Sequence, residues 1–581
     1  MLDDILSGVM KPGRYIGNEW NIARKDFDKA RIKFALCFPD LYEVGMSNLG
    51  IRIIYGILND IPDVVCERLF SPGLDLESNL RRSKVGIFSL ESRKALREFD
   101  IIGFSLGNEL SYTNILNILD LSAIPFSSRQ RGDDYPLIIG GGPCTLNPEP
   151  LHEFFDLFII GEAEEAIVEL INAYRQLKSS QISKRGLLIE LSKITGVYCP
   201  SLYTVEYSPE GNVLKFAPQL DSLPARVKKR IVDDLDSAYF PVNWLLPFIQ
   251  IIHDRISLEL MRGCPNSCRF CQARQQYYPY RLRSPEKIFQ AALQAYQRTG
   301  YEEIALTGLS VSDYPKIEEL IKQLMESFNG KCVGISLPSV KPKKTVGSLS
   351  TLIAAFKKTG LTFAPEAATD KLRTILGKEF NLQDFMQVVE EAFACGYLHV
   401  KLYFMIGLPF EETNDLDGII ELAEKISELG RKTRKRPAEV NLSINTLIPK
   451  PHTPFQWFGM SGIEEIKAKQ DYLKDRSSKN KRIKLSFHNR NMSFLEAVFS
   501  RGDRRLSRVI VNAYNAGARF DAWQEYFKFQ TWQSAFNDCG IDPQFYLQKR
   551  PLAGMLPWDF LDIGLSKEAL ISEFNKIIDI K

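Results

Sequence analysis

The sequence has no apolar run long enough to cross a membrane. Its most apolar stretch near the middle, residues 241–252, is interrupted by Asn243 and Gln250, whereas a transmembrane helix needs about 18 or more apolar residues in succession. The first residues, Met-Leu-Asp-Asp, lack the basic start and apolar stretch of a signal peptide. These absences predict a cytoplasmic protein without a membrane partner.

A surplus of charge of one sign is also missing. The chain has 74 Lys and Arg against 71 Asp and Glu, a formal net charge of +3, which does not force a role in binding polyanions. Basic residues gather locally in residues 431–436, in residues 467–484, and at Arg501, Arg504 and Arg505. Such runs can contact RNA phosphates, but we prefer the interpretation that they are solvated surfaces.

Cysteine is sparse. Ten cysteines in 581 residues are too few for the disulfide framework of small secreted domains. Seven are scattered singly and three lie close together. In a protein expected to be cytosolic, such a group indicates metal binding or catalysis.

The N-terminal part alternates between strand and helix patterns. A chain of 581 residues is too long for a single core and predicts roughly three or four domains. We treat residues 1–30 as an arm and residues 31–180 as a doubly wound, Rossmann-like α/β domain with a parallel sheet. Residues 181–250 read as a linker with a hairpin. The predicted strands of the sheet are residues 32–38, 64–70, 101–106, 136–139 and 157–160.

A second series of strands and helices fills residues 251–455. Its six units predict a partial (β/α)6 TIM-like barrel, in which sites lie at the carboxyl ends of strands. The pattern then turns mostly helical, and we place a separate C-terminal domain at residues 456–581. The predicted barrel strands are residues 256–261, 303–307, 333–337, 361–364, 399–406 and 440–447.

Three cysteines follow the first predicted barrel strand directly. Cys264, Cys268 and Cys271 have the spacing C-x3-C-x2-C. Because a structural 4Fe-4S cluster normally takes four thiolates, three leave one iron open to chelate a substrate. A zinc site is the alternative, with His253 or Cys332 as the fourth ligand, but structural zinc typically uses two close ligand pairs and no second pair exists.

With the aromatic Phe270 before its last cysteine, this motif resembles that of the radical S-adenosylmethionine (SAM) superfamily. The resemblance covers residues 250–450. It implies a partial TIM barrel, a 4Fe-4S cluster on Cys264, Cys268 and Cys271 as the catalytic metal centre, and SAM as cosubstrate. It also implies that Phe270 packs near the adenine.

Further SAM contacts carry over less directly. The family's Gly-Gly-Glu-like segment after the second strand corresponds here to Thr307, Gly308 and the nearby Ser310, without the acid, so backbone carbonyls or Ser310 would bind the methionyl amino group. Glu366 matches the position that contacts the ribose or the methionyl carboxylate, although a solvated acid at a helix N-terminus is equally consistent. Gly407 lies in a segment that resembles the adenine-binding fifth strand, where glycine permits close backbone approach; a strand-ending turn is the alternative.

The N-terminal domain resembles the cobalamin-binding domain of cobalamin-dependent radical SAM enzymes. That family carries Asp-x-His-x-x-Gly after the first strand, and here Asp40 and Gly45 keep the spacing while Tyr42 replaces the histidine. The resemblance implies cobalamin without a histidine lower ligand, although a sheet that packs on the barrel without cofactor is also possible. Four residues at later strand ends complete the match: Ser105, Gly140, Gly141 and Gly161.

The resemblance implies a reaction as well as cofactors. Over residues 31–581 the chain resembles a poorly characterised subgroup of these proteins, in which SAM cleavage at the cluster would lead to cobalamin-dependent C-methylation of an unknown small molecule, peptide or RNA. An electron donor such as flavodoxin or ferredoxin would be a partner. One alternative is a methylthiotransferase-like RNA modification enzyme, with an auxiliary cluster on Cys37, Cys66 and Cys144. Another is a non-catalytic cobalamin and iron-sulfur sensor.

Overall fold

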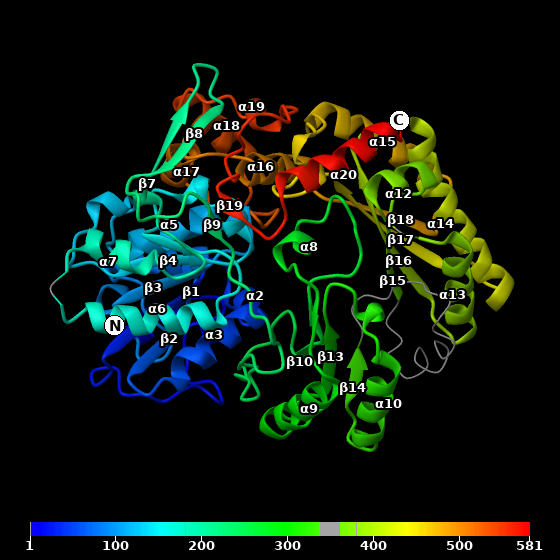
Figure 1. The fold of residues 1–581 in the computed structure, drawn as a ribbon. Coiled ribbons are helices and arrows are strands. Elements are labelled where there is room, and N and C mark those ends of the chain that lie inside the picture. Colours follow the sequence, from blue (N-terminus) through cyan, green and yellow to red (C-terminus); the bar gives the residue numbers. More distant parts are fainter. Residues whose placement is uncertain (1, 181, 337–360, 379, 581) are drawn as a thin grey trace.

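The computed structural model describes residues 2–180, 182–336, 361–378 and 380–580. Its N-terminal part is a sheet in the order β2-β1-β3-β4-β5-β6 (Figure 1). Neighbours from β2 to β5 are parallel, and β6 pairs antiparallel with β5. The strands are β1 (Ile32–Phe38), β2 (Val64–Phe70), β3 (Ile101–Ser105), β4 (Leu137–Gly141), β5 (Leu157–Ile159) and β6 (Val197–Tyr198).

The strand order places a switch point between β1 and β3. The chain passes from β1 to β2 on one side and then returns to add β3 on the other side of β1. In doubly wound sheets, ligands bind outside the carboxyl ends of the strands at such a point. Two helices, α3 (Leu49–Asp60) and α6 (Glu164–Leu177), pack against each other over this sheet, as Figure 1 shows.

The barrel consists of two parallel sheets, β10-β13-β14 and β15-β16-β17-β18. Helix α9 (Pro285–Thr299) follows β12 and is capped by the Ser284 hydroxyl, which accepts from the Lys287 backbone N–H. Of the predicted strand 333–337, Leu337 lies outside the described residues. The strands are β10 (Ile256–Glu259), β13 (Glu303–Thr307), β14 (Gly334–Ser336), β15 (Leu361–Glu366), β16 (His399–Ile406), β17 (Glu439–Thr446) and β18 (Ile483–Phe487).

The predicted α/β fold class is confirmed, but the barrel sheet extends beyond the expected six strands and past residue 455. The added strand, β18, pairs in parallel with β17. It lies within a lysine- and arginine-rich stretch, where Ile483, Leu485 and Phe487 alternate with more exposed residues. Because only one face of this strand is buried, its apolar residues are too few to stand out against the charged ones.

The C-terminal region is mostly helical, as predicted, but it does not form a core of its own. Buried side chains between residues 492 and 563 belong to the same hydrophobic core as the N-terminal sheet. In that core α17 (Leu506–Asn515) packs on α5 (Tyr112–Leu121). The last helix, α20 (Lys567–Asp579), instead covers the barrel, with Phe574 against Trp457 at 5.6 Å between ring centroids.

The linker hairpin is present as β7 (Tyr203–Tyr207) and β8 (Val213–Pro218), while residues 197–198 belong to the N-terminal sheet as β6. The arm includes a short helix, α1 (Leu2–Ser7), which packs on α4 (Leu74–Ser83). None of the helices in the described ranges has the length and apolarity needed to cross a bilayer.

Candidate functional site

The three cysteines lie on a loop at the carboxyl end of the first barrel strand. The chain leaves β10 through β11 (Met261–Arg262), forms the cysteine loop and α8 (Gln272–Gln276), and returns through β12 (Arg281–Leu282), which pairs antiparallel with β11. Gly263 opens the loop with a positive φ of 78°, and a Cβ there would lie 2.8 Å from the backbone oxygens of Tyr277 and Pro279. Only glycine fits this close approach without strain.

Two helices outside the first barrel sheet also hold the cysteine loop in place. The backbone N–H of Arg269 donates to the carbonyl of Leu376 at 2.8 Å. The Arg269 guanidinium reaches the carbonyl of Thr374 and pairs with Glu573 of α20 at 2.9 Å. The loop therefore bridges α12 (Asp370–Leu376) and the C-terminal helix, which fixes the backbone that carries the thiols.

The environment of the three thiols fits an iron-sulfur cluster. None forms a disulfide, and all are half-buried. Burial raises the pKa of Cys268 to about 11; the positive charge of Lys378 opposes this shift, whereas the nearby Cys271 and Cys264 reinforce it. Because the three cysteines lie within one eight-residue stretch of the loop, a cationic cluster bound there would stabilise all three thiolates together.

The described ranges contain no group of three His, Cys, Asp or Glu side chains drawn together as around a single metal ion. A cubane cluster places its thiolates on different irons and spreads them more widely than a single ion does.

Three of the predicted SAM residues lie beside the cysteine loop, together with an acid that the sequence analysis missed. Thr307 ends β13 and its hydroxyl donates to the carbonyl of Leu258. The Ser310 hydroxyl donates to Asp313 at 2.6 Å, and the Asn266 amide donates to Asp313 at 2.9 Å while lying 3.2 Å from the Cys264 sulfur. A carboxylate thus sits next to the first cysteine, where an ammonium group would bind.

Gly308 directly follows Thr307 in the same turn. A Cβ on Gly308 would lie 2.8 Å from the Met261 side chain. A side chain at this position would therefore push β13 away from β11 and from the cysteine loop.

Glu366 lies at the end of β15, close enough to Cys268 to affect its pKa. It has a positive φ of 67°, which is strained for a residue other than glycine. Burial raises the pKa of the Glu366 carboxyl, and Lys378, at 3.6 Å, opposes that shift. Such a strained, half-buried acid beside the cysteines is better matched to binding a ligand than to a solvated helix start.

The two remaining predicted SAM residues, Gly407 and Phe270, pack against other parts of the chain. The N–H of Gly407, which directly follows β16, donates to the Glu411 carboxylate at 2.9 Å, and a Cβ on Gly407 would meet Ile466 at 2.8 Å. Phe270 packs against the hydrophobic cluster that contains Leu372 and Trp457. Phe270 lies within the cysteine loop itself, between Cys268 and Cys271, and Gly407 lies at the carboxyl end of β16.

A cavity of about 530 Å³ lies between the N-terminal sheet and the barrel. This volume is within the range of cofactor pockets. One wall is formed by the sheet and by α3 and α6. The other wall comes from β11, Gly263 and the turn after β13. The cavity thus joins the switch point of the sheet to the residue that precedes Cys264, and none of the described residues that line it is a histidine.

Of the residues predicted to bind cobalamin, Ser105, Gly141 and Gly161 line this cavity. Ser105 and Gly141 are paired across β3 and β4. Gly161 has a φ of 100°, and a Cβ on it would lie 2.2 Å from the carbonyl of Arg230. Thr307 and Gly308 line the barrel side of the same cavity, so the structure brings the two predicted groups together.

Four other predicted cobalamin residues do not line the cavity. The contacts of each with other side chains explain its presence instead. Tyr42 is buried in α2 (Tyr42–Gly45), donates its hydroxyl to Glu19 at 2.8 Å and packs edge-on against a phenylalanine. The Asp40 carboxylate accepts from the indole of Trp523 at 2.8 Å. Close packing accounts for the two glycines, Gly45 and Gly140, whose added Cβ atoms would collide with Phe70 and Phe158.

A buried ion network joins the two walls of the cavity. Arg262, which is 6% exposed, pairs with Glu259 at 2.9 Å, with Glu162 at 3.4 Å and with Glu164. Glu162 also pairs with Arg281 at 2.6 Å. Glu162 and Glu164 follow β5, whereas Arg262 and Arg281 flank the cysteine loop. The network therefore joins the N-terminal sheet to the cysteine loop.

The three N-terminal cysteines do not form a comparable site. Cys37 and Cys66 lie within β1 and β2, and Cys144 lies in a short turn after β4. All three are buried, and burial raises the pKa of each thiol. Thiols of this kind behave as small core residues.

A doubly wound sheet that faces a partial barrel across a cavity, with a three-thiol loop at the barrel's first strand, defines the class of protein. Family models agree with it: one described as the radical SAM superfamily matches residues 258–423, and one described as radical SAM proteins, N-terminal, matches residues 50–200. The chain belongs to the radical SAM superfamily.

Several known proteins are similar to the chain. An uncharacterized protein of Methanocaldococcus jannaschii is 27% identical over 511 residues, which cover 87% of this chain and 97% of the relative. The threonylcarbamoyladenosine tRNA methylthiotransferase MtaB of Thermotoga maritima is 25% identical over 237 residues, 38% of this chain and 50% of that protein. Among solved structures, the apo form of the cobalamin-dependent SAM radical enzyme OxsB matches with a TM-score of 0.48 and 13% identity, covering 94% of this chain and 78% of that one.

Proposed function

We propose that this radical SAM enzyme binds cobalamin in the cavity at the carboxyl edge of the N-terminal sheet and transfers a methyl group to a carbon of its substrate. One observation carries the proposal: the cavity wall includes both strand-end residues of the sheet, such as Ser105 and Gly141, and Gly263, the residue before Cys264. A cofactor bound there lies next to the site where the cluster and SAM would be held.

The residues of the chain supply holding and orientation. Cys264, Cys268 and Cys271 would hold the cluster, and the Asp313 carboxylate with Ser310 would bind the methionyl ammonium group. Glycines at the sheet edge allow the corrinoid to approach the backbone. When bound, the reduced cluster with SAM would supply a deoxyadenosyl radical, and methylcobalamin would supply the methyl group.

The methylthiotransferase alternative needs an auxiliary cluster on the N-terminal cysteines. The burial of Cys37 and Cys66 within strands, where neighbouring side chains alternate between faces, does not favour it.

We further propose a cytoplasmic location and a flavodoxin or ferredoxin as the electron donor, since the cluster must be reduced before each turnover.

Corrinoid retention tests the cofactor assignment. Gly107 lines the cavity, and a Cβ on it would meet no atom within 4 Å, so Gly107→Phe should fill the cavity without straining the fold. Gly462 is an exposed glycine with the same free space outside the cavity, and Gly462→Phe is the matched control.

After incubation with hydroxocobalamin and gel filtration, the wild type and Gly462→Phe should retain corrinoid absorption and Gly107→Phe should lose it. Equal retention by all three, or none by the wild type, would refute cobalamin binding in this cavity. With cofactors loaded, formation of S-adenosylhomocysteine together with 5′-deoxyadenosine supports methyl transfer. Corrinoid binding without either product would instead identify a sensor.

A further inference from the structure

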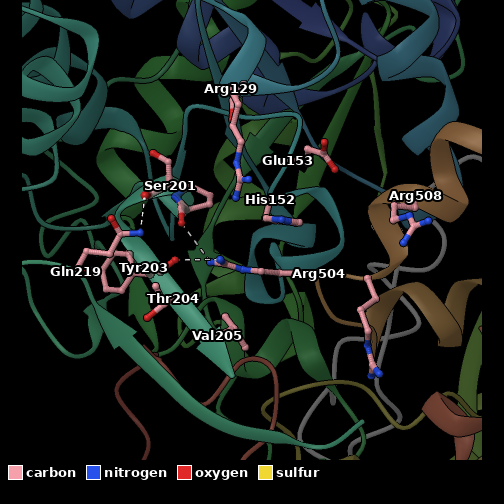
Figure 2. A pocket seen from close by; sticks show the side chains of 13 residues that line it. Arg129, His152, Glu153, Ser201, Tyr203, Thr204, Val205, Gln219, Arg504 and Arg508 are labelled. Atoms are coloured by element: carbon pink, nitrogen blue, oxygen red, sulfur yellow. Dashed lines mark hydrogen bonds between the residues drawn. The ribbon is translucent and has the colours of Figure 1, made fainter. Parts of the chain in front are cut away.

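A second cavity, of about 490 Å³, lies near the amino ends of strands of the N-terminal sheet. Figure 2 shows the side chains that line it. Its lining includes Arg129, on the turn before β4, and His152, on the turn before β5. These turns precede their strands and therefore mark the amino edge of the sheet. The five-residue β4 separates this edge from the carboxyl edge by about 17 Å. The two cavities share no lining residue.

Arginine dominates the lining of the second cavity, and two of its four arginines are already paired. Arg504 donates to the buried Glu149 at 2.7 Å and to the Tyr203 carbonyl at 3.0 Å. Arg505 pairs with the buried Asp503 at 2.7 Å. These two arginines, which the sequence analysis treated as solvated surface, hold the hairpin and the start of α17 together.

The other two arginines are available to a ligand. The side chains of Arg129 and Arg508 are exposed and make no hydrogen bond or ion pair to any residue that the structure describes. Figure 2 shows Arg129 and Arg504 extending into the cavity from different elements, with His152 beside them. Burial, and then the charges of Arg504 and Arg129, lower the pKa of His152 to about 3. Arg504 and Arg129 therefore lie close enough to His152 for their charges to oppose its protonation.

The remaining lining is suited to hydroxyl groups. Ser201 and Thr204 are exposed at the start of the hairpin, and Glu153 is the one acid among the described lining residues. A carboxylate of this kind accepts hydrogen bonds from sugar hydroxyls in nucleotide sites. Guanidinium groups bind phosphate through paired, charge-assisted hydrogen bonds. The cavity therefore combines two free cations with acceptors for a sugar.

We propose that this cavity binds a small phosphorylated ligand, a nucleotide or a sugar phosphate. Its phosphate would lie at Arg129 and Arg508, and its hydroxyls would face Glu153, Ser201 and Thr204. The site is separate from the cluster, so the ligand would act as an effector or as the anchor of a larger substrate. The proposal does not depend on the reaction at the carboxyl edge.

Binding of adenosine 5′-monophosphate to the full chain, measured by calorimetry at fixed ionic strength, tests the proposal. Adenosine is the matched ligand without the phosphate. Arg129→Gln with Arg508→Gln removes the two free cations. The matched control, Arg24→Gln with Arg482→Gln, removes two exposed arginines that lie outside the cavity. Their side chains likewise make no hydrogen bond or ion pair to any residue that the structure describes.

The nucleotide should bind the wild type and the control alike, and at least about tenfold more weakly to the Arg129/Arg508 variant; adenosine should bind none of them measurably. Equal binding of both ligands, or no loss in the variant, would overturn the proposal. Ribose 5-phosphate in place of the nucleotide tests whether the base matters. A short single-stranded RNA that binds when neither small phosphate does would show that the site is an RNA contact and would also overturn the proposal.

Discussion

Replacing Arg262 by methionine tests how much the buried ion pairs between the N-terminal sheet and the cysteine loop stabilise the protein. Arg262 is 6% exposed and pairs with three carboxylates. In the variant, Glu162 keeps its pair with Arg281, but Glu164 loses the partner that it has among the described residues. Removing one member of a buried ion pair costs about 3–5 kcal/mol, and we expect the free energy of unfolding to fall by that amount at neutral pH.

The pH dependence gives the same prediction a second readout. Burial raises the pKa of Glu162, but the hydrogen bond from Arg281 and the charge of Arg262 outweigh it and lower this pKa overall. A lowered folded-state pKa contributes stability above the ordinary carboxyl pKa and loses it as the pH falls. The difference in the free energy of unfolding between the wild type and Arg262→Met should therefore become smaller as the pH falls, because the wild type loses the contribution of the ionised Glu162.

Urea unfolding of the anaerobically purified protein measures both effects. The control is Arg431→Met, which removes an arginine of similar size from an exposed pair with Glu428 at 3.3 Å and should cost less than about 1 kcal/mol. If Arg262→Met lowered the free energy of unfolding by no more than the control does, the proposed role of the buried ion pairs would be refuted.

Three further predictions concern single side chains. Tyr42→Phe removes the hydroxyl bonded to Glu19 and should cost about 1 kcal/mol without changing the absorption spectrum of bound corrinoid; a spectral shift would place Tyr42 at the cofactor. Burial lowers the pKa of His452, which is 5% exposed, to about 4. The stability linked to His452 is therefore present above pH ~6.5 and falls by up to about 3 kcal/mol as the pH drops toward 4; urea unfolding of His452→Gln should show a shallower pH dependence, and an unchanged slope would contradict this. Asp313→Asn should weaken SAM binding by about tenfold, measured by equilibrium dialysis, with unchanged iron content; unaltered SAM affinity would remove Asp313 from the site.

Much of the fold was predictable because its strands are nearly continuous apolar runs. Every residue of β2 is buried, as are all but one in β1, which is typical of a parallel sheet covered on both faces. Such strands stand out in the sequence. By contrast, β18 buries one face within a basic stretch, and the shared core of the C-terminal helices and the N-terminal sheet depends on contacts between distant segments, which local patterns do not report.

The candidate site shows the same division between local and distant information. The cysteine spacing is local and was enough to locate the loop. Asp313 was missed because an acid was expected directly after Gly308, whereas the short helix Val311–Asp313 brings the carboxylate back to Ser310. Tyr42 matched a cofactor position by spacing alone, but its side chain is buried against Glu19. Spacing fixes the position of a residue along the chain but not the direction of its side chain.

The most direct test of the central claim is reductive SAM cleavage by the anaerobically reconstituted protein, with 5′-deoxyadenosine quantified by mass spectrometry and the cluster followed by electron paramagnetic resonance. The comparison is with Cys264→Ala/Cys268→Ala/Cys271→Ala, and with Cys332→Ala as the control for an exposed cysteine outside the loop. We predict 5′-deoxyadenosine and a SAM-dependent change in the cluster signal for the wild type and Cys332→Ala, and neither for the triple variant. A wild-type protein that binds no iron, or whose cluster signal does not respond to SAM, would contradict the assignment.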